Sequence, residues 1–177
     1  MSVKEKKTVP LGLKLGYTIG SIGDSTAYNI VISFLSFFLT TIAGISPAMA
    51  GTISSIAIAW DAVTDPILGV MVDSSKSKNG KRRPFIGISL IPMVVSIVFL
   101  FMKVNFPQAQ KNIYYLIVVL IFWTSYTAFN IPYYSLGSVI TNDDDERAKI
   151  AGFREAMGFV GIFCGTSVPT FLVGKLT

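Results

Sequence analysis

Residues 60–66 read WDAVTDP and lie inside an apolar run, residues 53–72, that is long enough to cross a lipid bilayer. A carboxylate inside a membrane-spanning helix costs several kcal/mol, so an acidic residue there usually has a function. Asp61 and Asp65 stand four residues apart in this run. The stretch therefore predicts a membrane helix that carries a polar site.

The rest of the chain is equally apolar. Of its 177 residues 51% are hydrophobic and 14% charged, and the mean hydropathy is +0.60, unlike a soluble domain. No soluble domain or long linker interrupts the apolar runs. We predict an all-α membrane protein whose helices form one bundle and span residues 15–42, 47–72, 84–102, 113–140 and 150–173.

The formal charge of +5 is a topology signal rather than a surface for nucleic acid. Basic residues cluster before the first span and between the second and third; they are Lys4, Lys6, Lys7, Lys14, Lys76, Lys78, Lys81, Arg82 and Arg83. By the positive-inside rule both segments face the cytoplasm. We expect a multi-pass plasma-membrane protein, in a bacterium the inner membrane, with a cytoplasmic N-terminus and no nucleic-acid partner.

Cysteine and histidine usage argues against an enzyme. Cys164 is the single cysteine and histidine is absent, so the sequence offers no disulfide and no thiolate or imidazole metal cluster. No nucleophile and base pair is evident. The two aspartates share one helical turn, whereas the dyad of an intramembrane aspartyl protease usually draws its acids from separate elements.

Asp61 and Asp65 lie on one helix face, because residues four apart differ by about 40° around the axis. Repulsion between them is relieved by a small hard cation or by a shared proton, and the sequence leaves open which of the two binds. Pro66 is expected to bias Asp65 away from ideal helix and to free a backbone carbonyl. Pairing of each aspartate with a basic side chain is the structural alternative.

Other polar residues fall at similar depths in their helices. At about 1.5 Å per residue, Asp24 and Asp65 lie about 12 Å from the cytoplasmic ends of their helices. By the same measure Asn130, Asp61 and Thr127 lie about 15, 18 and 20 Å deep. The sequence therefore predicts a polar cavity near the bilayer midplane, where transporters bind substrate and coupling ions.

Two aromatic residues and one arginine extend this hypothesis. Trp60 and Tyr134 neighbour the polar positions, and such rings stack on sugars, although most membrane aromatics are structural. Arg154 lies just inside the last predicted span. It either snorkels to lipid headgroups or pairs with an acid of the first or second helix.

Four stretches together resemble the glycoside-pentoside-hexuronide:cation symporters, the melibiose-permease-like members of the major facilitator superfamily. They are GYTIGSIGDSTAYN at 16–29, WDAVTDPILGVMVDSSKSKNGKRRP at 60–84, NIPYYSL at 130–136 and TNDDDERAKIAGFR at 141–154. The resemblance runs from about Leu13 to Gly165 and is most specific in the second stretch.

The resemblance implies twelve helices in two six-helix halves, alternating access, and sugar uptake driven by Na⁺, H⁺ or Li⁺ without another cofactor. It places the cation at Asp61, Asp65 and Thr127. It also implies a cytoplasmic gate formed by the loop after the second span, at Gly69, Asp73, Gly80, Arg82 and Arg83.

The sugar side of the resemblance is looser. Asn130 stands where melibiose permease has an aspartate, and Tyr134 where it has a tryptophan. The sugar-binding aspartate of the first helix falls on Ser25, with Asp24 one place early. The expected substrate-binding set is Asp24, Ser25, Trp60, Asn130, Tyr134 and Arg154.

Five helices are fewer than the six of one half-transporter, so we expect an N-terminal fragment, a partial bundle over residues 1–177. Its expected partners are a sugar or glycoside, membrane lipid, and the missing C-terminal helices or a partner chain. The alternatives are a major facilitator carrying a non-sugar solute, such as a lipid or drug, and a non-transporting membrane subunit.

Overall fold

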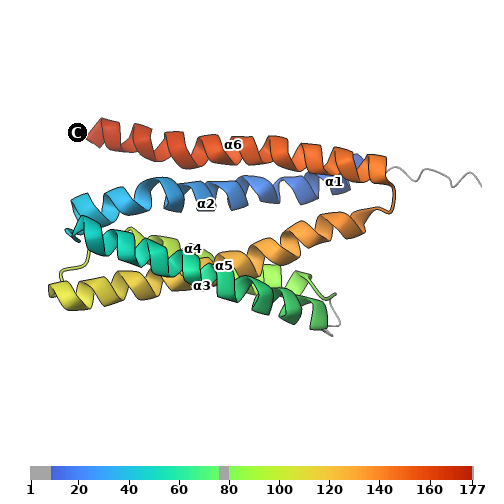
Figure 1. Cartoon of the computed structure of the whole chain (residues 1–177). Coiled ribbons are helices and arrows are strands. Elements are labelled where there is room, and N and C mark those ends of the chain that lie inside the picture. Colours follow the sequence, from blue (N-terminus) through green and yellow to red (C-terminus); the bar gives the residue numbers. More distant parts are fainter. Residues whose placement is uncertain (1–8, 76–79, 177) are drawn as a thin grey trace, which may run out of the picture. The chain divides into compact units, whose positions relative to one another are not determined.

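The computed structural model describes residues 9–75 and 80–176, and within these ranges the chain is helical with no strand (Figure 1). The helices are α1 (Leu11–Thr18), α2 (Gly20–Phe37), the π-helical turn η1 (Phe38–Ile42), α3 (Pro47–Ser74), α4 (Arg83–Leu100), α5 (Gln108–Ile140) and α6 (Asp144–Leu176). Among the basic residues on which the predicted orientation rests, five lie outside the described residues: Lys4, Lys6, Lys7, Lys76 and Lys78.

Within the described residues, four helical segments are long and apolar enough to cross a membrane. They are Leu11–Ile42, Pro47–Ser74, Arg83–Leu100 and Gln108–Ile140. These segments overlap the first four predicted spans. The fifth predicted span lies within α6 and runs past Phe171, the last residue whose side chain is described, so that crossing stays a prediction.

The first span is not one regular helix but consists of α1, α2 and η1 in succession. Ile19 separates α1 from α2, and its carbonyl accepts the N–H of Ile22 in a tightened turn. Further on, the N–H of Ala43 reaches back five residues to the carbonyl of Phe38. The Thr40 hydroxyl donates to the Ser36 carbonyl at 2.8 Å, a local competition with backbone bonding that favours such irregular turns.

The α3 helix is continuous through Pro66, so the expected departure of Asp65 from helical geometry is wrong. The helix begins with Ser46, whose side chain accepts the N–H of Met49, and with Pro47 in the first turn. The proline leaves the carbonyl four residues earlier without its N–H partner. Asp61 and Asp65 nevertheless lie one turn apart on one continuous helix.

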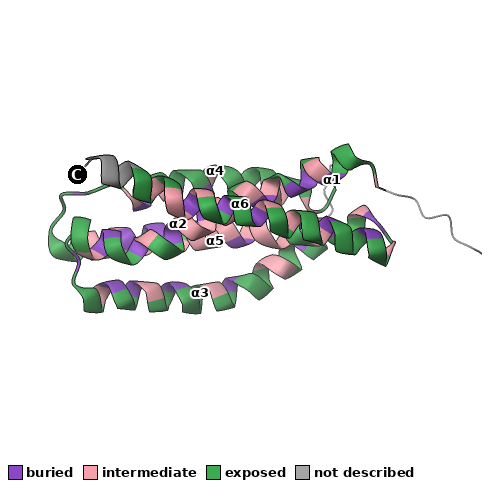
Figure 2. Cartoon of the chain, turned by 90° about the horizontal axis from the view of Figure 1, so that it is seen from above, coloured by how far each residue is buried: buried purple, intermediate pink, exposed green. Residues whose placement is uncertain are grey.

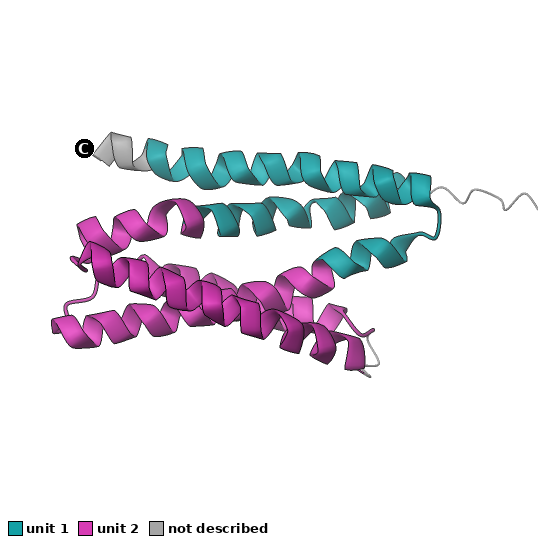
Figure 3. Cartoon of the chain, in the orientation of Figure 1, with its two compact units in different colours: residues 1–30, 134–177 teal, residues 31–133 magenta. Residues whose placement is uncertain are grey.

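The chain forms two compact units (Figure 3). Unit 1 combines Met1–Ile30 with Tyr134–Thr177, and unit 2 is Val31–Tyr133. In unit 2 the ring of Tyr115 is fully buried, meets the Phe38 ring edge-on at 6.0 Å and donates its hydroxyl to the Met102 carbonyl. In unit 1, α1 contacts α6.

Many large apolar residues are exposed along the helices, and Figure 2 shows how exposed residues are distributed on the ribbon. Ile58 on α3 is 72% exposed and Ile88 on α4 is 73% exposed. Buried residues occur as short segments along the helices, alternating with intermediate and exposed ones. Lipid tails are as apolar as these side chains, so a membrane helix gains little by burying them and associates mainly through packing and hydrogen bonds.

Candidate functional site

Unit 2 brings together two of the three predicted cation-binding residues. Asp61 lies in the middle of α3 and Thr127 lies on α5. The Thr127 hydroxyl, which is buried, donates to Asp61 Oδ1 at 2.8 Å. A carboxylate and a hydroxyl oxygen from two helices therefore meet at one point in the membrane.

Asp65 follows one turn after Asp61 on the same helix and is exposed. Between them, the Thr64 hydroxyl donates to the carbonyls of Trp60 and Asp61 at 3.1 and 3.3 Å. Residues four apart rise about 6 Å along a helix, close enough for both carboxylates to contact one small ion. Carboxylate, hydroxyl and carbonyl oxygens are the ligands that hard cations prefer.

Two residues predicted to bind substrate also lie in unit 2. The Trp60 indole N–H donates to the Thr124 hydroxyl at 2.9 Å, while 43% of the residue is exposed. The Asn130 amide donates to the Tyr126 hydroxyl at 3.2 Å. Each side chain therefore has a partner within the protein that orients it.

Unit 1 holds a second polar group, formed by Asp24, Tyr134 and Arg154. Asp24 on α2 is 2% exposed, and its Oδ2 accepts the Tyr134 hydroxyl at 3.4 Å. The Arg154 guanidinium on α6 lies over the Tyr134 ring, 4.2 Å from its centroid, in a cation–π contact. One aromatic ring thus contacts both a carboxylate and a guanidinium.

Arg154 also has partners that the sequence analysis missed. Its Nη2 pairs with Glu155 Oε1 of its own helix at 2.6 Å, and its side chain hydrogen-bonds the buried Tyr17 of α1. Tyr17 is not among the predicted site residues. It stands seven residues before Asp24, a spacing that returns to the same helix face, and this was the available signal.

Ser25 points elsewhere. Its Cβ would lie 2.8 Å from a Cβ added at Gly161, and its hydroxyl 3.2 Å from one added at Gly158, both on α6. The structure thus places Ser25 against the glycine face of α6. The acid that meets Tyr134 is Asp24, the residue one place before the position that the resemblance indicated.

A cavity of about 200 Å³ opens beside this group in unit 1. Its walls include Tyr17, Tyr134, Ser138, Arg147 and Arg154. Guanidinium, phenol and hydroxyl groups provide many hydrogen-bond donors and aromatic faces. Such a lining suits a small hydroxylated solute.

The predicted gate residues surround the loop between α3 and α4, of which residues 76–79 are outside the described part. Gly69 lies on α3, and the carbonyl of Asp73 accepts the Lys81 ammonium at 3.2 Å. Gly80 has a φ of +92°, a backbone conformation that favours glycine. Arg82 occupies the N-cap position of α4 without a side-chain capping bond, and Arg83 begins the helix.

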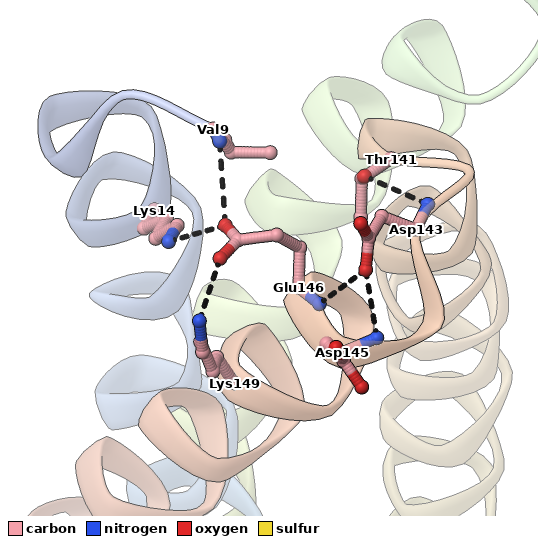
Figure 4. Close-up of polar contacts among 7 residues, drawn as sticks. All are labelled: Val9, Lys14, Thr141, Asp143, Asp145, Glu146 and Lys149. Atoms are coloured by element: carbon pink, nitrogen blue, oxygen red, sulfur yellow. Dashed lines mark hydrogen bonds and ion pairs between the residues drawn. The ribbon is translucent and has the colours of Figure 1, made fainter. Parts of the chain in front are cut away.

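The Glu146 cluster, at the start of α6 in unit 1, was not predicted (Figure 4). The Glu146 carboxylate is buried and accepts the Lys14 ammonium at 2.6 Å, the Lys149 ammonium at 3.0 Å and the Val9 N–H at 3.3 Å. These donors, led by Lys14, lower the pKa of Glu146 from 4.5 to about 2. The carboxylate is therefore charged under all ordinary conditions.

This pKa predicts how Glu146 contributes to stability. Because the folded pKa of about 2 lies below the ordinary 4.5, the charge stabilises the folded state above pH 4.5 and the contribution fades between pH 4.5 and 2. The difference in thermal midpoint between the native chain and Glu146→Gln should be constant above pH 4.5 and shrink below it. A difference that titrates well above that pH would contradict the assignment.

Apolar helical segments with carboxylate, hydroxyl and guanidinium groups between helices are typical of a multi-pass membrane protein that carries a polar site. A family model described as "MFS/sugar transport protein" matches residues 16–177. The chain belongs to this family, within the major facilitator superfamily, and the resemblance to the glycoside-pentoside-hexuronide:cation symporters is confirmed.

Three relatives illustrate the family. The uncharacterized symporter YjmB of Bacillus subtilis is 35% identical over 95% of this chain and 37% of its own length. The isoprimeverose transporter of Lactiplantibacillus pentosus is 30% identical over 90% of the chain and 33% of its own length. The sodium-dependent lysophosphatidylcholine symporter 1-A of Danio rerio is 30% identical over 97% of the chain and 32% of its own length. The chain spans about a third of each relative.

Proposed function

We propose that the chain provides the cation site and part of the substrate site of a cation-coupled symporter. The observation that carries this proposal is the 2.8 Å bond from Thr127 to Asp61, with Asp65 one turn away on α3. Two carboxylates close together in a membrane repel each other and are costly to bury, and a coupling Na⁺, H⁺ or Li⁺ bound between them relieves that cost. The hydroxyl orients one carboxylate for the ion and adds an oxygen ligand.

The proposed substrate is a sugar or glycoside. Its support is the Asp24–Tyr134–Arg154 group, since an aromatic face beside charged hydrogen-bonding groups suits a hydroxylated ring. The name of the isoprimeverose transporter agrees with this choice. The name of the lysophosphatidylcholine symporter supports a lipid as the second candidate, and Arg154 is the residue that would favour its phosphate.

We also propose that the N-terminus is cytoplasmic and that Gly69, Asp73, Gly80, Arg82 and Arg83 belong to a cytoplasmic gate. The basic loop supports the orientation. Fixed charges on a loop that includes Gly80 suit a latch that must form and break during alternating access.

Uptake by the complete transporter tests the substrate and the ion together. Radiolabelled glycosides, pentoses, hexuronides and lysophosphatidylcholine are offered to vesicles under imposed gradients of Na⁺, Li⁺ or H⁺. We expect at least one glycoside or pentose to accumulate at least about tenfold faster with an inward gradient of one cation than without it, because ion binding then drives the conformational cycle. Accumulation of lysophosphatidylcholine alone would establish the second candidate, and uptake indifferent to every cation would overturn symport.

A further inference from the structure

The start of α1 lacks a cap of its own. Pro10 occupies the N-cap position, no side chain of α1 caps the first turn, and that turn holds no acid. The first N–H groups of a helix need an acceptor, and its positive dipole end favours an anion. Glu146 of α6 places a carboxylate beside this end of α1: it accepts the N–H of Val9, which lies just before the N-cap, and it pairs with Lys14 of the helix.

Glu146 is free for this role because α6 is capped by other residues. Asp143 and Glu146 stand at the positions of a capping box, in which the glutamate would bond the N–H of the capping residue. Here the Asp143 N–H donates to the Thr141 hydroxyl instead, at 3.1 Å, and Asp143 Oδ1 accepts the N–H groups of Asp145 and Glu146. The Glu146 carboxylate instead lies between Lys149 of its own helix, which donates to Oε1 at 3.0 Å, and Lys14 of α1, which pairs with Oε2 at 2.6 Å.

The same face of α1 contacts α6 again one turn later. Lys14 and Tyr17 are three residues apart and therefore neighbours on the helix surface. Lys14 pairs with Glu146, and Tyr17 hydrogen-bonds Arg154 and lies against Gly137. Two contacts thus join α1 to α6, and the second contains a residue of the substrate group.

We propose that Glu146 is a positioning residue: by clamping the start of α1 to the first turn of α6, it holds Tyr17 against Arg154 beside the cavity. The consequence for the substrate group rests on the proposed function, whereas the clamp itself does not. Glu146 touches no substrate in this proposal. It acts through Lys14 of α1 and through Val9, which lies just before that helix.

Hydrogen exchange of the full chain in detergent tests the clamp without any transport assay. Glu146→Gln should speed amide exchange in residues 9–16 by about tenfold to a hundredfold, as expected for losing bonds to a charged group. Asp144→Asn is the matched control, since Asp144 is a neighbouring acid whose side chain is 92% exposed and whose partner Arg147 is also half-exposed. It should leave exchange unchanged, and equal exchange in the native chain and Glu146→Gln would overturn the clamp.

Alkylation tests whether the clamp reaches the cavity. Ala151 lines the cavity with Tyr17 and Arg154, so Ala151→Cys in a Cys164→Ser background reports on its packing. Adding Glu146→Gln should raise the rate of maleimide alkylation by roughly tenfold, because α1 then opens locally. An unchanged rate beside faster exchange in α1 would show a cap only and overturn the positioning role.

Transport kinetics give a further readout. Glu146→Gln should raise the substrate KM by about ten- to a hundredfold, as for a displaced binding group, and leave the half-activating cation concentration unchanged. Lys14→Met should raise the substrate KM in the same way, whereas Lys14→Arg keeps the charge and should have the native KM. The double variant Lys14→Met with Glu146→Gln should have a KM no higher than that of Glu146→Gln alone. A parallel rise in the substrate KM and in the half-activating cation concentration would indicate general damage and contradict the proposal. If no substrate is transported, the proposed function fails, while exchange and alkylation still decide the clamp and its reach.

Discussion

Asparagine in place of Asp61 is expected to abolish cation-driven accumulation of substrate by the complete transporter. Asparagine matches aspartate in size, and its amide oxygen can still accept the Thr127 hydroxyl, which now bonds Asp61 at 2.8 Å. Only the charge is removed. Losing an interaction with a charged group costs up to about 3 kcal/mol, or roughly a hundredfold in ion affinity.

The measurement is the initial uptake rate in vesicles as a function of cation concentration, with downhill exchange as the sign of a folded protein. Asp65→Asn should behave like Asp61→Asn. Thr127→Val keeps both charges and should weaken ion activation by about tenfold or less. Ser55→Ala on the exposed side of α3 is the control that should change nothing, because its hydroxyl only bonds the Gly51 carbonyl. Normal ion coupling in both asparagine variants would refute the cation site.

Alanine at Gly161 is expected to destabilise unit 1 strongly. An added Cβ would overlap the Ile22 carbonyl oxygen and lie 2.8 Å from Ser25 Cβ, and backbone cannot move aside as a flexible side chain can. Separating α2 from α6 would also break the 3.1 Å bond from the Thr26 hydroxyl to the Gly161 carbonyl. Overpacking of this kind costs about 1–3 kcal/mol, and the lost hydrogen bond about 1 kcal/mol more.

Gly152 on the same helix provides the matched control. A Cβ there meets nothing within 4 Å, so Gly152→Ala should stabilise the helix by up to about 1 kcal/mol through its better propensity. The two substitutions are chemically identical and should shift the thermal midpoint in detergent in opposite directions. A stabilising Gly161→Ala would show that α2 and α6 do not pack as closely as described.

Sequence periodicity and composition predicted the apolar helices because lipid imposes a simple rule. Every backbone group must be satisfied internally, so a long apolar run becomes a helix whatever its neighbours are. Asp61 and Asp65 could be selected because a carboxylate is conspicuous in such a run, whereas the family resemblance indicated Thr127. The irregular turn at Thr40 and the uninterrupted course of α3 through Pro66 were not predictable, since both depend on which carbonyls find other donors.

The sequence by itself determined the membrane class, the family resemblance and the cation candidates, because each depends on residue type and on spacing along one helix. Only the tertiary structure decided which residues from different helices meet. It placed Asp24 rather than Ser25 beside Tyr134, gave Arg154 the partners Glu155 and Tyr17, and turned Glu146 toward α1. The physical reason is that a side chain's partner across helices depends on the rotation and separation of both helices, and spacing along one chain fixes neither.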